Sequence, residues 1–341
     1  MLEVLESAEL TKFTISKSQY VNKDLIVMFG DDNLAPQRMN ELFNGSQTVI
    51  CAENLYENAV LGENDDIPEW LVMSVRDWFL FGGYYLMVSR DLEGNIVRIK
   101  HIPFEMCRLT SPDDSGRFNS IAVADWGHRM KGKKVKGVLY PTFDVKPESA
   151  YGAYGHTISI YHHFSPTPNF YPTSRFAAVL QDCSSEQLLQ SDRWNALVNG
   201  SAEKIVIRTE IPQDEIAKRK LIEKVTEWAT PKGSRILLCN SQFSTDGDNL
   251  TNDFNITTIP DNRNLIAGEF ETRVSTNIAK AANVPAPLIQ SSTNMFSGEV
   301  IRQSQQLLIF STMRDRAHFT KLLNKFGYDI TLEPPQPVNF E

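Results

Sequence analysis

The sequence contains few cysteines, no long apolar run and no basic leader. Its cysteines are widely separated, so neither a disulfide framework nor a cysteine-based zinc site is expected. No apolar stretch approaches the ~20 residues that a membrane-spanning helix needs. The first residues, Met1 to Glu6, are acidic and lack the basic start of a signal peptide. We expect a cytoplasmic protein without a membrane partner, whose thiols are reduced: Cys51, Cys107, Cys183 and Cys239.

Motifs for nucleophilic or metal-dependent catalysis are also missing. The sequence has neither Gly-x-Ser-x-Gly nor His-Glu-x-x-His. The adjacent His162 and His163 point to opposite faces if they lie on a strand, so they cannot share one metal. Carboxylates are plentiful, but no spacing singles out a catalytic pair. We therefore expect no catalytic residue, no metal site and no cofactor.

The stretch from Gly127 to Lys134 has the two glycines and the lysine of a phosphate-binding loop. However, Lys134 stands where the metal-binding hydroxyl should be, and the residues from Val135 onward are typical of a strand. Without a helix N-terminus there is no amide cradle, so nucleotide binding is not expected. We favour a solvated basic turn over a contact for DNA or an acidic partner. Its basic residues are Arg129, Lys131, Lys133, Lys134 and Lys136.

The chain has 341 residues and a formal net charge of −8. This length allows two or three modules of about 150 residues. The negative balance disfavours a protein that coats nucleic acid, because such proteins neutralise phosphates with lysine and arginine. It leaves open a protein that lets DNA pass without binding it tightly.

Residues 67–172 are predicted to be an α+β module, whereas residues 1–66 show no readable pattern. A helix starts near Asp66, with Pro68 in its first turn, and ends at Gly82. A strand at 84–88 and a returning strand at 96–99 form a hairpin around the turn at 91–95. Further strands are expected at 121–124, 135–140 and 157–161.

Two long helices are expected to flank a small module. The first occupies residues 173–200, is capped by Thr173 or Ser174, and has a polar middle. The second occupies residues 261–283 and carries a narrow apolar stripe. Residues 201–260 between them predict a β-α-β-β insert with strands at 204–208, 235–239 and 254–259 and a helix opened by Pro212. The stripe residues are Ile266, Phe270, Val274, Ile278 and Ala282.

The second helix is followed by Val284 and Pro285, which cannot continue it. Residues 284–298 form a small, polar loop region. One long helix is then expected over residues 299–326, ended by Gly327, and it would reach roughly 40 Å if unbroken. The remaining segment, 327–341, is a proline-rich tail that is not helical.

In this order the parts resemble the portal proteins of tailed bacteriophages, the head–tail connectors of long-tailed phages. The first segment on which the resemblance rests is the tryptophan-bearing helix that runs into an aromatic Gly-Gly-Tyr-Tyr strand, from Trp70 to Val88. Another is the long helix that opens after Tyr171 and closes at Gly200. The third is the Val284-Pro285 stop with its polar loop and final helix. The resemblance covers residues 67–326.

The resemblance implies a homo-oligomeric ring, typically of twelve subunits, at one vertex of a capsid in the virion. Double-stranded DNA would be packaged and ejected through the channel of the ring after assembly in the host cytoplasm. The major capsid protein, the large terminase subunit and a head–tail adaptor would be partners. The implied parts are a wing (67–172), two stem helices (173–200 and 261–283) and a clip (201–260). Little chain remains after Phe326, so the crown is expected to be absent or reduced.

The resemblance also implies where partners bind. Terminase and the adaptor would dock on the clip, through Glu215, Lys218, Arg219, Glu223, Trp228 and Lys232. DNA would face a tunnel loop whose polar, uncharged side chains contact phosphates without holding them. Met295 and Phe296 either narrow the channel or pack on the helices behind. The loop consists of Gln290, Ser291, Ser292, Thr293, Asn294, Met295, Phe296 and Ser297.

Two alternatives remain open on the sequence. Another structural ring protein of the head–tail region would form rings or tubes whose bore is too narrow for duplex DNA. A metal-dependent DNA-processing enzyme would use some of the scattered carboxylates, and metal-stimulated cleavage lost on one acidic substitution would reveal it.

Overall fold

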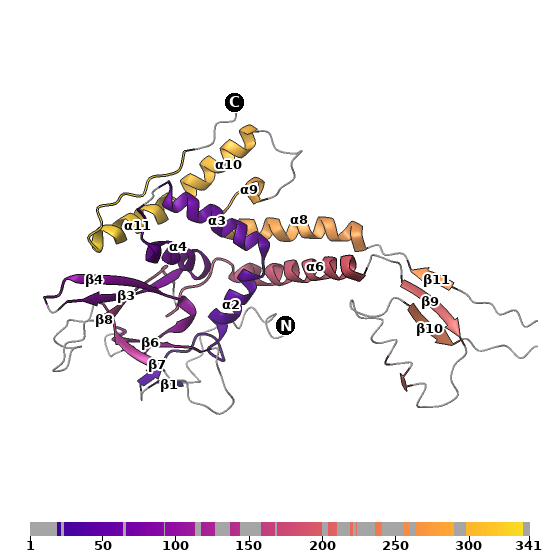
Figure 1. The fold of residues 1–341 in the computed structure, drawn as a ribbon, viewed down its shortest axis with the longest axis horizontal. Helices are drawn as coiled ribbons and strands as arrows, with labels where there is room; N and C mark the ends of the chain where they lie inside the picture. The colour runs from indigo at the N-terminus through magenta and orange to yellow at the C-terminus, as the bar shows by residue number, and fades with distance from the viewer. Residues whose placement is uncertain are drawn as a thin grey trace, which may run out of the picture. The chain divides into compact units, whose positions relative to one another are not determined.

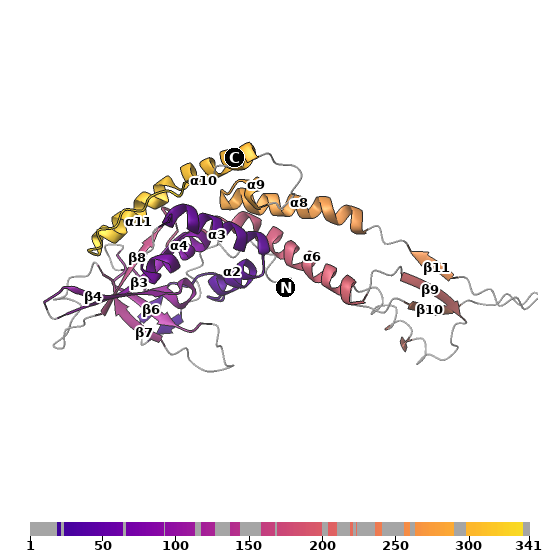
Figure 2. The same ribbon diagram turned by 45° about the horizontal axis from the view of Figure 1, so that its top comes forward.

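The computed structural model, drawn in Figures 1 and 2, divides into two compact units. The larger unit comprises residues 1–184 and 274–341, and the smaller one residues 185–273. None of the described helices is both long and apolar enough to cross a membrane. The structure describes residues 19–21, 24–63, 66–91, 93–112, 117–126, 137–143, 158–167, 169–199, 204–209, 219–220, 223, 236–240, 256–259, 263–289 and 298–336.

The larger unit combines two three-stranded sheets with helices. Both sheets are antiparallel, with strand orders β4-β3-β8 and β5-β6-β7. A short antiparallel ribbon, β1-β2, precedes them. The α+β architecture expected for residues 67–172 is therefore confirmed. The strands are β1 (Gln19–Val21), β2 (Asp24–Ile26), β3 (Gly83–Arg90), β4 (Ile96–Ile102), β5 (Cys107–Leu109), β6 (Ser120–Ala124), β7 (Gly137–Pro141) and β8 (Ile158–Phe164).

The β3–β4 hairpin forms where the turn residues predict it. Asp91 Oδ1 accepts hydrogen bonds from the backbone amides of Glu93 at 3.0 Å and Asn95 at 2.8 Å. Gly94 has a φ of 90°, a left-handed value that favours glycine. The side chain of Asp91 thus satisfies the turn amides, which fixes the register of the two strands.

An aromatic core surrounds α4 (Glu69–Phe81), which begins after Pro68 and ends at a left-handed Gly82. Phe81 stacks on Phe104 with ring centroids 4.8 Å apart, and Phe79 meets Phe176 edge-on at 5.3 Å. These contacts join α4 to the short 3₁₀ turn η2 (Phe104–Met106) and to the segment before α6. All four rings are buried. The helix predicted near Asp66 is confirmed and forms the centre of the larger unit.

The N-terminal region contains two helices that the sequence pattern did not indicate. These are α2 (Ala35–Asn44) and α3 (Gln47–Leu61), the latter capped by Ser46, whose Oγ accepts from the Val49 amide at 3.2 Å. Arg108 ties the residues just before α2 to β5, because its guanidinium donates to both Oδ1 and the backbone carbonyl of Asn33. Arg108 is fully buried, and this burial lowers its pKa. The start of the chain is therefore part of the same core.

The long helix expected over residues 173–200 begins later than predicted. The helix α6 spans Leu180–Asn199 and follows a 3₁₀ turn, η3 (Ala177–Val179). Ser174 Oγ donates to the carbonyl of Leu80 and accepts from the Phe176 amide. This geometry places Phe176 in the core, and the chain becomes α-helical only after that turn.

The long helix expected over residues 299–326 is broken into two. It consists of α10 (Gly298–Ser311) and α11 (Met313–Lys325), separated at Thr312, whose ψ is 0°. Thr312 Oγ1 donates to the carbonyls of Leu308 at 2.9 Å and Ile309 at 3.2 Å, and Arg316 donates to Ile309 at 2.7 Å. Side chains thus compete for carbonyls that the helical ladder would use, which breaks the helix.

The smaller unit holds a three-stranded sheet of order β10-β9-β11. The strands are β9 (Lys204–Thr209), β10 (Ile236–Asn240) and β11 (Ile256–Ile259). β10 runs parallel to β9, so the chain must cross over between them, and β11 runs antiparallel to β9. The three strands of the expected β-α-β-β insert are therefore confirmed. Pro212 and most of the expected helix lie outside the described residues.

A stack of histidines and aromatic rings joins α11 to the β4-β3-β8 sheet. The rings of His318 and His163 are 4.3 Å apart, and Trp78 stacks on His318 at 5.2 Å. His318 Nε2 lies 2.9 Å from the hydroxyl of Tyr84. Burial lowers the pKa of His318 to about 4, with a further lowering by His163. The pKa of His163 is also lowered, first by burial and then by Lys325.

The stack predicts that acid destabilises the fold. Both folded-state pKa values lie below the ordinary value of 6.5, so the unfolded chain binds protons that the folded chain does not. The free energy of unfolding should therefore be highest above about pH 6.5 and fall as the pH drops toward about 4. The Tm of the unmodified chain should be lower at pH 5 than at pH 7.5. We expect His318→Gln to reduce this difference by a few degrees.

Thermal unfolding followed by circular dichroism at the two pH values measures this difference. His162→Gln, outside the stack but on the same strand, is the matched control. If His318→Gln keeps the pH dependence of the unmodified chain, the stack is not the group that senses acid.

Candidate assembly surfaces

The helices α6 and α8 (Arg263–Ala282) lie side by side and run in opposite directions. In the larger unit, Asn277 Nδ2 donates to Asp182 Oδ2 at 3.2 Å. In the smaller unit, the guanidinium of Arg193 binds both carboxylate oxygens of Glu271, one of them at 2.7 Å. A solvent-exposed pair of this kind contributes less than about 1 kcal/mol, so it orients the two helices more than it stabilises them.

The apolar stripe predicted on the second long helix is buried in its second half, whereas Phe270 is half-buried and the side chain of Ile266 lies outside the described residues. Val274, Ile278 and Ala282 are almost inaccessible to solvent. The helix ends as expected: Asn283 has a left-handed φ of 57°, and the Val284 amide donates to the carbonyl of Ala279. This face is therefore used within the chain and is not available to a partner.

Two large apolar side chains of α6 are exposed. Leu188 is 50% and Trp194 67% accessible to solvent, and they lie about a third of a turn apart around the helix. Tryptophan is enriched at protein interfaces, where it buries a large area. These two residues define one broad candidate contact surface, which we call the α6 face.

The helix α10 carries a second exposed stripe, formed by Val300, Leu307 and Phe310. Leu307 is 62% and Phe310 73% exposed, whereas Ser304 and Leu308 on the adjoining side of the helix are buried. The spacings of seven and three residues match the a and d positions of a helix–helix seam. Met313, at the start of α11, adds an exposed side chain beyond this stripe. The α10 stripe therefore has the pattern of a surface that packs against another helix.

Burying these side chains would release substantial free energy. A fully buried leucine or phenylalanine contributes about 1.5–3 kcal/mol relative to an exposed one. Several on one helix are enough to drive association of copies at modest concentration. Because the α6 face and the α10 stripe are different surfaces, two subunits in contact can use one of each and leave the others free for further copies.

The residues predicted to contact DNA and partners are only partly described. The tunnel loop, Gln290–Ser297, lies outside the described residues, between α9 (Ala286–Ile289) and α10. In the clip, Arg219 and Glu223 are helical and exposed, while Glu215, Lys218, Trp228 and Lys232 fall outside the described residues. The same holds for the basic tip between β6 and β7, with Arg129, Lys131, Lys133, Lys134 and Lys136.

Comparison with known proteins bears on the fold. No family model and no curated protein matches the sequence. A chain in the neck of an empty gene transfer agent (GTA) particle, computed with C6 symmetry, superposes with a TM-score of 0.54 at 13% identity, over 91% of this chain and 82% of that one. A chain in the neck of a native GTA particle, computed with C12 symmetry, gives 0.51 at 15% identity, over 98% and 88%. The chain shares the fold of a virion neck protein.

Two further likenesses complete the comparison. A chain in the virion of a native GTA particle has a TM-score of 0.53 at 13% identity, over 87% of this chain and 79% of that one. A crystal structure of an HK97 family phage portal protein from Corynebacterium diphtheriae has a TM-score of 0.43 at 12% identity, over 81% and 88%. This last value is too low to carry an argument. At these identities the likeness establishes fold alone, and the α+β fold class expected from the sequence is confirmed by the helices and small sheets of the structure.

The exposure of the α10 stripe was not predicted from the sequence. Leu307 and Phe310 are exposed, whereas Leu308 and Phe319 of the same final helices are buried. The signal was present, because a helix with apolar residues at positions 300, 307, 308 and 310 has more than one apolar face. Only the structure shows which of these faces the chain covers.

The α10 stripe predicts a variant that stays folded but no longer self-associates. Leu307→Gln with Phe310→Gln changes exposed residues, so the stability of a single chain should move by no more than about 0.5 kcal/mol. Mass photometry should show a shift from assemblies to single chains. Val138→Gln, which changes an exposed valine on β7, is the matched control and should assemble normally. Unchanged assembly of the double variant would rule out the stripe as a subunit contact.

Proposed function

We propose that the chain is a portal protein, which assembles as a ring at a capsid vertex and serves as the channel for DNA packaging and ejection. The observation that carries the proposal is the combination of a virion-neck fold with two apolar helix surfaces that one chain leaves uncovered. A closed ring needs two different surfaces on each subunit, which meet across every contact. The α6 face and the α10 stripe supply such a pair.

The electrostatics support a channel through which DNA slides. Duplex DNA carries one charge per ~1.7 Å, so a lysine-rich lining would bind it tightly and retard its movement. Residues 290–297 contain neither acidic nor basic side chains. In the proposed ring this tunnel loop faces the DNA, and its hydroxyl and amide groups exchange phosphate contacts at low cost as DNA advances.

Residues 201–260, the insert within the smaller unit, are proposed as the clip, on which terminase and later the head–tail adaptor dock. Arg219 and Glu223 are exposed residues of both signs on one short segment, which suits a reversible polar contact. The capsid protein would contact the larger unit. Another ring protein of the head–tail region, the alternative, would have a bore too narrow for duplex DNA.

Negative-stain microscopy of the purified full-length chain tests the proposed function. We expect rings with a central hole wide enough for duplex DNA. A chain that remains a single copy at high concentration would contradict the proposal. Rings or tubes with a narrower hole would favour a different head–tail protein.

The tunnel loop predicts a defect that appears after assembly. Deleting Ser291–Met295 should leave rings intact, because the deletion lies between α9 and α10 and outside both apolar surfaces. Packaging or retention of DNA should fall severalfold, as measured by the DNA content of particles. Exchanging the same five residues for Gly-Ser-Gly-Ser-Gly keeps the length and the absence of charge, and should preserve most of the activity. Normal DNA-filled particles from the deletion would show that this loop does not face DNA.

A further inference from the structure

The edge of the β4-β3-β8 sheet is open on one side. β4 pairs with β3, and no other described strand pairs with its second edge. An unpaired edge presents a row of backbone donors and acceptors to any extended segment that fits beside it. The register shift opposite Ser89 and Arg90 is confined to the start of β4, so the strand is regular from Arg98 to Ile102.

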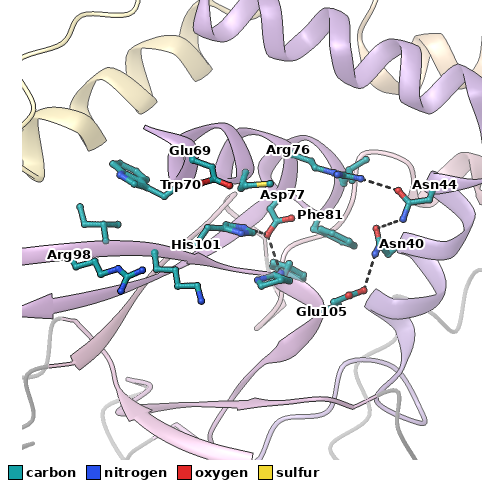
Figure 3. Close-up of a pocket in the computed structure, with 16 residues that line it drawn as sticks. Asn40, Asn44, Glu69, Trp70, Arg76, Asp77, Phe81, Arg98, His101 and Glu105 are labelled. Carbon is teal, nitrogen blue, oxygen red and sulfur yellow. Dashed lines mark hydrogen bonds and ion pairs between the residues drawn. The ribbon is translucent and has the colours of Figure 1, made fainter. Parts of the chain in front are cut away.

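A pocket of about 840 Å³ lies along this edge, between β4, α4 and α2. Figure 3 shows His101 reaching from β4 toward Asp77 on α4, with a distance of 2.7 Å between Nε2 and Oδ2. The carboxylate of Glu105 accepts from Asn40, which leaves Glu69 as the remaining acidic group of the lining. Apolar side chains of Trp70, Met73 and Ile99 line the same space. The indole Nε1 of Trp70 is buried and has no hydrogen-bond partner among the described residues.

The two faces of β4 offer different chemistry to an added strand. Alternate residues of a strand point to opposite faces. Because His101 contacts α4, Ile99 lies on the α4 face, and Arg98 and Lys100 lie on the other. Both basic residues are exposed, and neither side chain makes a hydrogen bond or ion pair with any residue that the structure describes. An added strand would therefore meet Ile99 and the apolar part of the pocket on one side and two positive charges on the other.

We propose that the β4 edge binds an extended, acidic segment of a partner protein by strand addition. Its residues alternate between acidic side chains, which lie opposite Arg98 and Lys100, and apolar side chains, which enter the pocket beside Ile99 and Met73. A second copy of β4 is a poor occupant, because its own Arg98 and Lys100 would lie close to the same positive charges. This site is separate from the α10 stripe and does not depend on ring formation.

A synthetic eight-residue peptide that alternates glutamate and valine is the probe. The fluorescently labelled peptide is titrated with the full-length chain and should bind. Hydrogen exchange of the backbone amides should slow at residues 96–102. Arg98→Glu with Lys100→Glu should weaken binding roughly tenfold or more, because two attractive cross-strand pairs become repulsive. A peptide that alternates lysine and valine should bind this variant better than the original chain.

Arg314→Glu with Lys321→Glu is the matched control, since it makes the same change of charge at exposed positions on α11. It should leave peptide binding unchanged. Absence of binding to the original chain would overturn the proposal, as would binding that the β4 variant does not weaken. Binding without slower exchange at β4 would indicate charge attraction alone and would exclude strand addition. Dimers of the original chain in which the amides of residues 96–102 exchange slowly without peptide would show that a second copy is the occupant, which also contradicts the proposal.

Discussion

The packing of aromatic rings around α4 is the interaction on which the larger unit depends. Phe79, Phe81 and Trp78 contact residues from η2, the segment before α6, and α11. Each such pair stabilises the fold by about 0.5–1.5 kcal/mol beyond the contribution of the apolar area that it buries. The two rings of each pair come from segments that are far apart in the sequence. One short helix thereby fixes the sheet, the base of the α6–α8 pair and the final helices of the unit. The acid sensitivity of the His163–His318 stack is a consequence of the same packing.

The exposed apolar surfaces show that this packing is incomplete in a single chain. The core covers Leu308 and Phe319 but leaves Leu307 and Phe310 in solvent on the same final pair of helices. Residues of α11 pack on the sheet, through His318 and Phe319, whereas α10 contacts α9 and α3. In the proposed ring, contacts between copies would cover the apolar side chains that the core of one chain leaves exposed.

Local sequence rules predicted the elements that local chemistry controls. Pro68, Gly82 and the Asp91 turn placed α4 and the β3–β4 hairpin, and Asn283 with Val284 placed the end of α8. The elements that were not predicted depend on contacts between residues far apart in the sequence. Residues 35–61 are helical largely because they pack on the α4 core, and Arg108 is buried because Asn33, 75 positions away, accepts its hydrogen bonds. Likewise, the competition of Thr312 and Arg316 for the Ile309 carbonyl breaks a helix whose apolar pattern is continuous.

The same distinction holds for the candidate site, where some features could be predicted from the sequence and others could not. An uncharged loop and a small insert between two long helices are visible in the sequence, because they depend on composition and order. Which apolar face remains exposed, and which sheet edge remains open, depends on the tertiary fold and was not predictable.

Cryo-electron microscopy of the assembled particle tests the central claim most directly. The account predicts a closed ring in which the α10 stripe is buried against the neighbouring copy and residues 290–297 lie nearest the symmetry axis. A reconstruction in which Leu307 and Phe310 remain in solvent, or in which residues 290–297 lie on the outer surface, would contradict it.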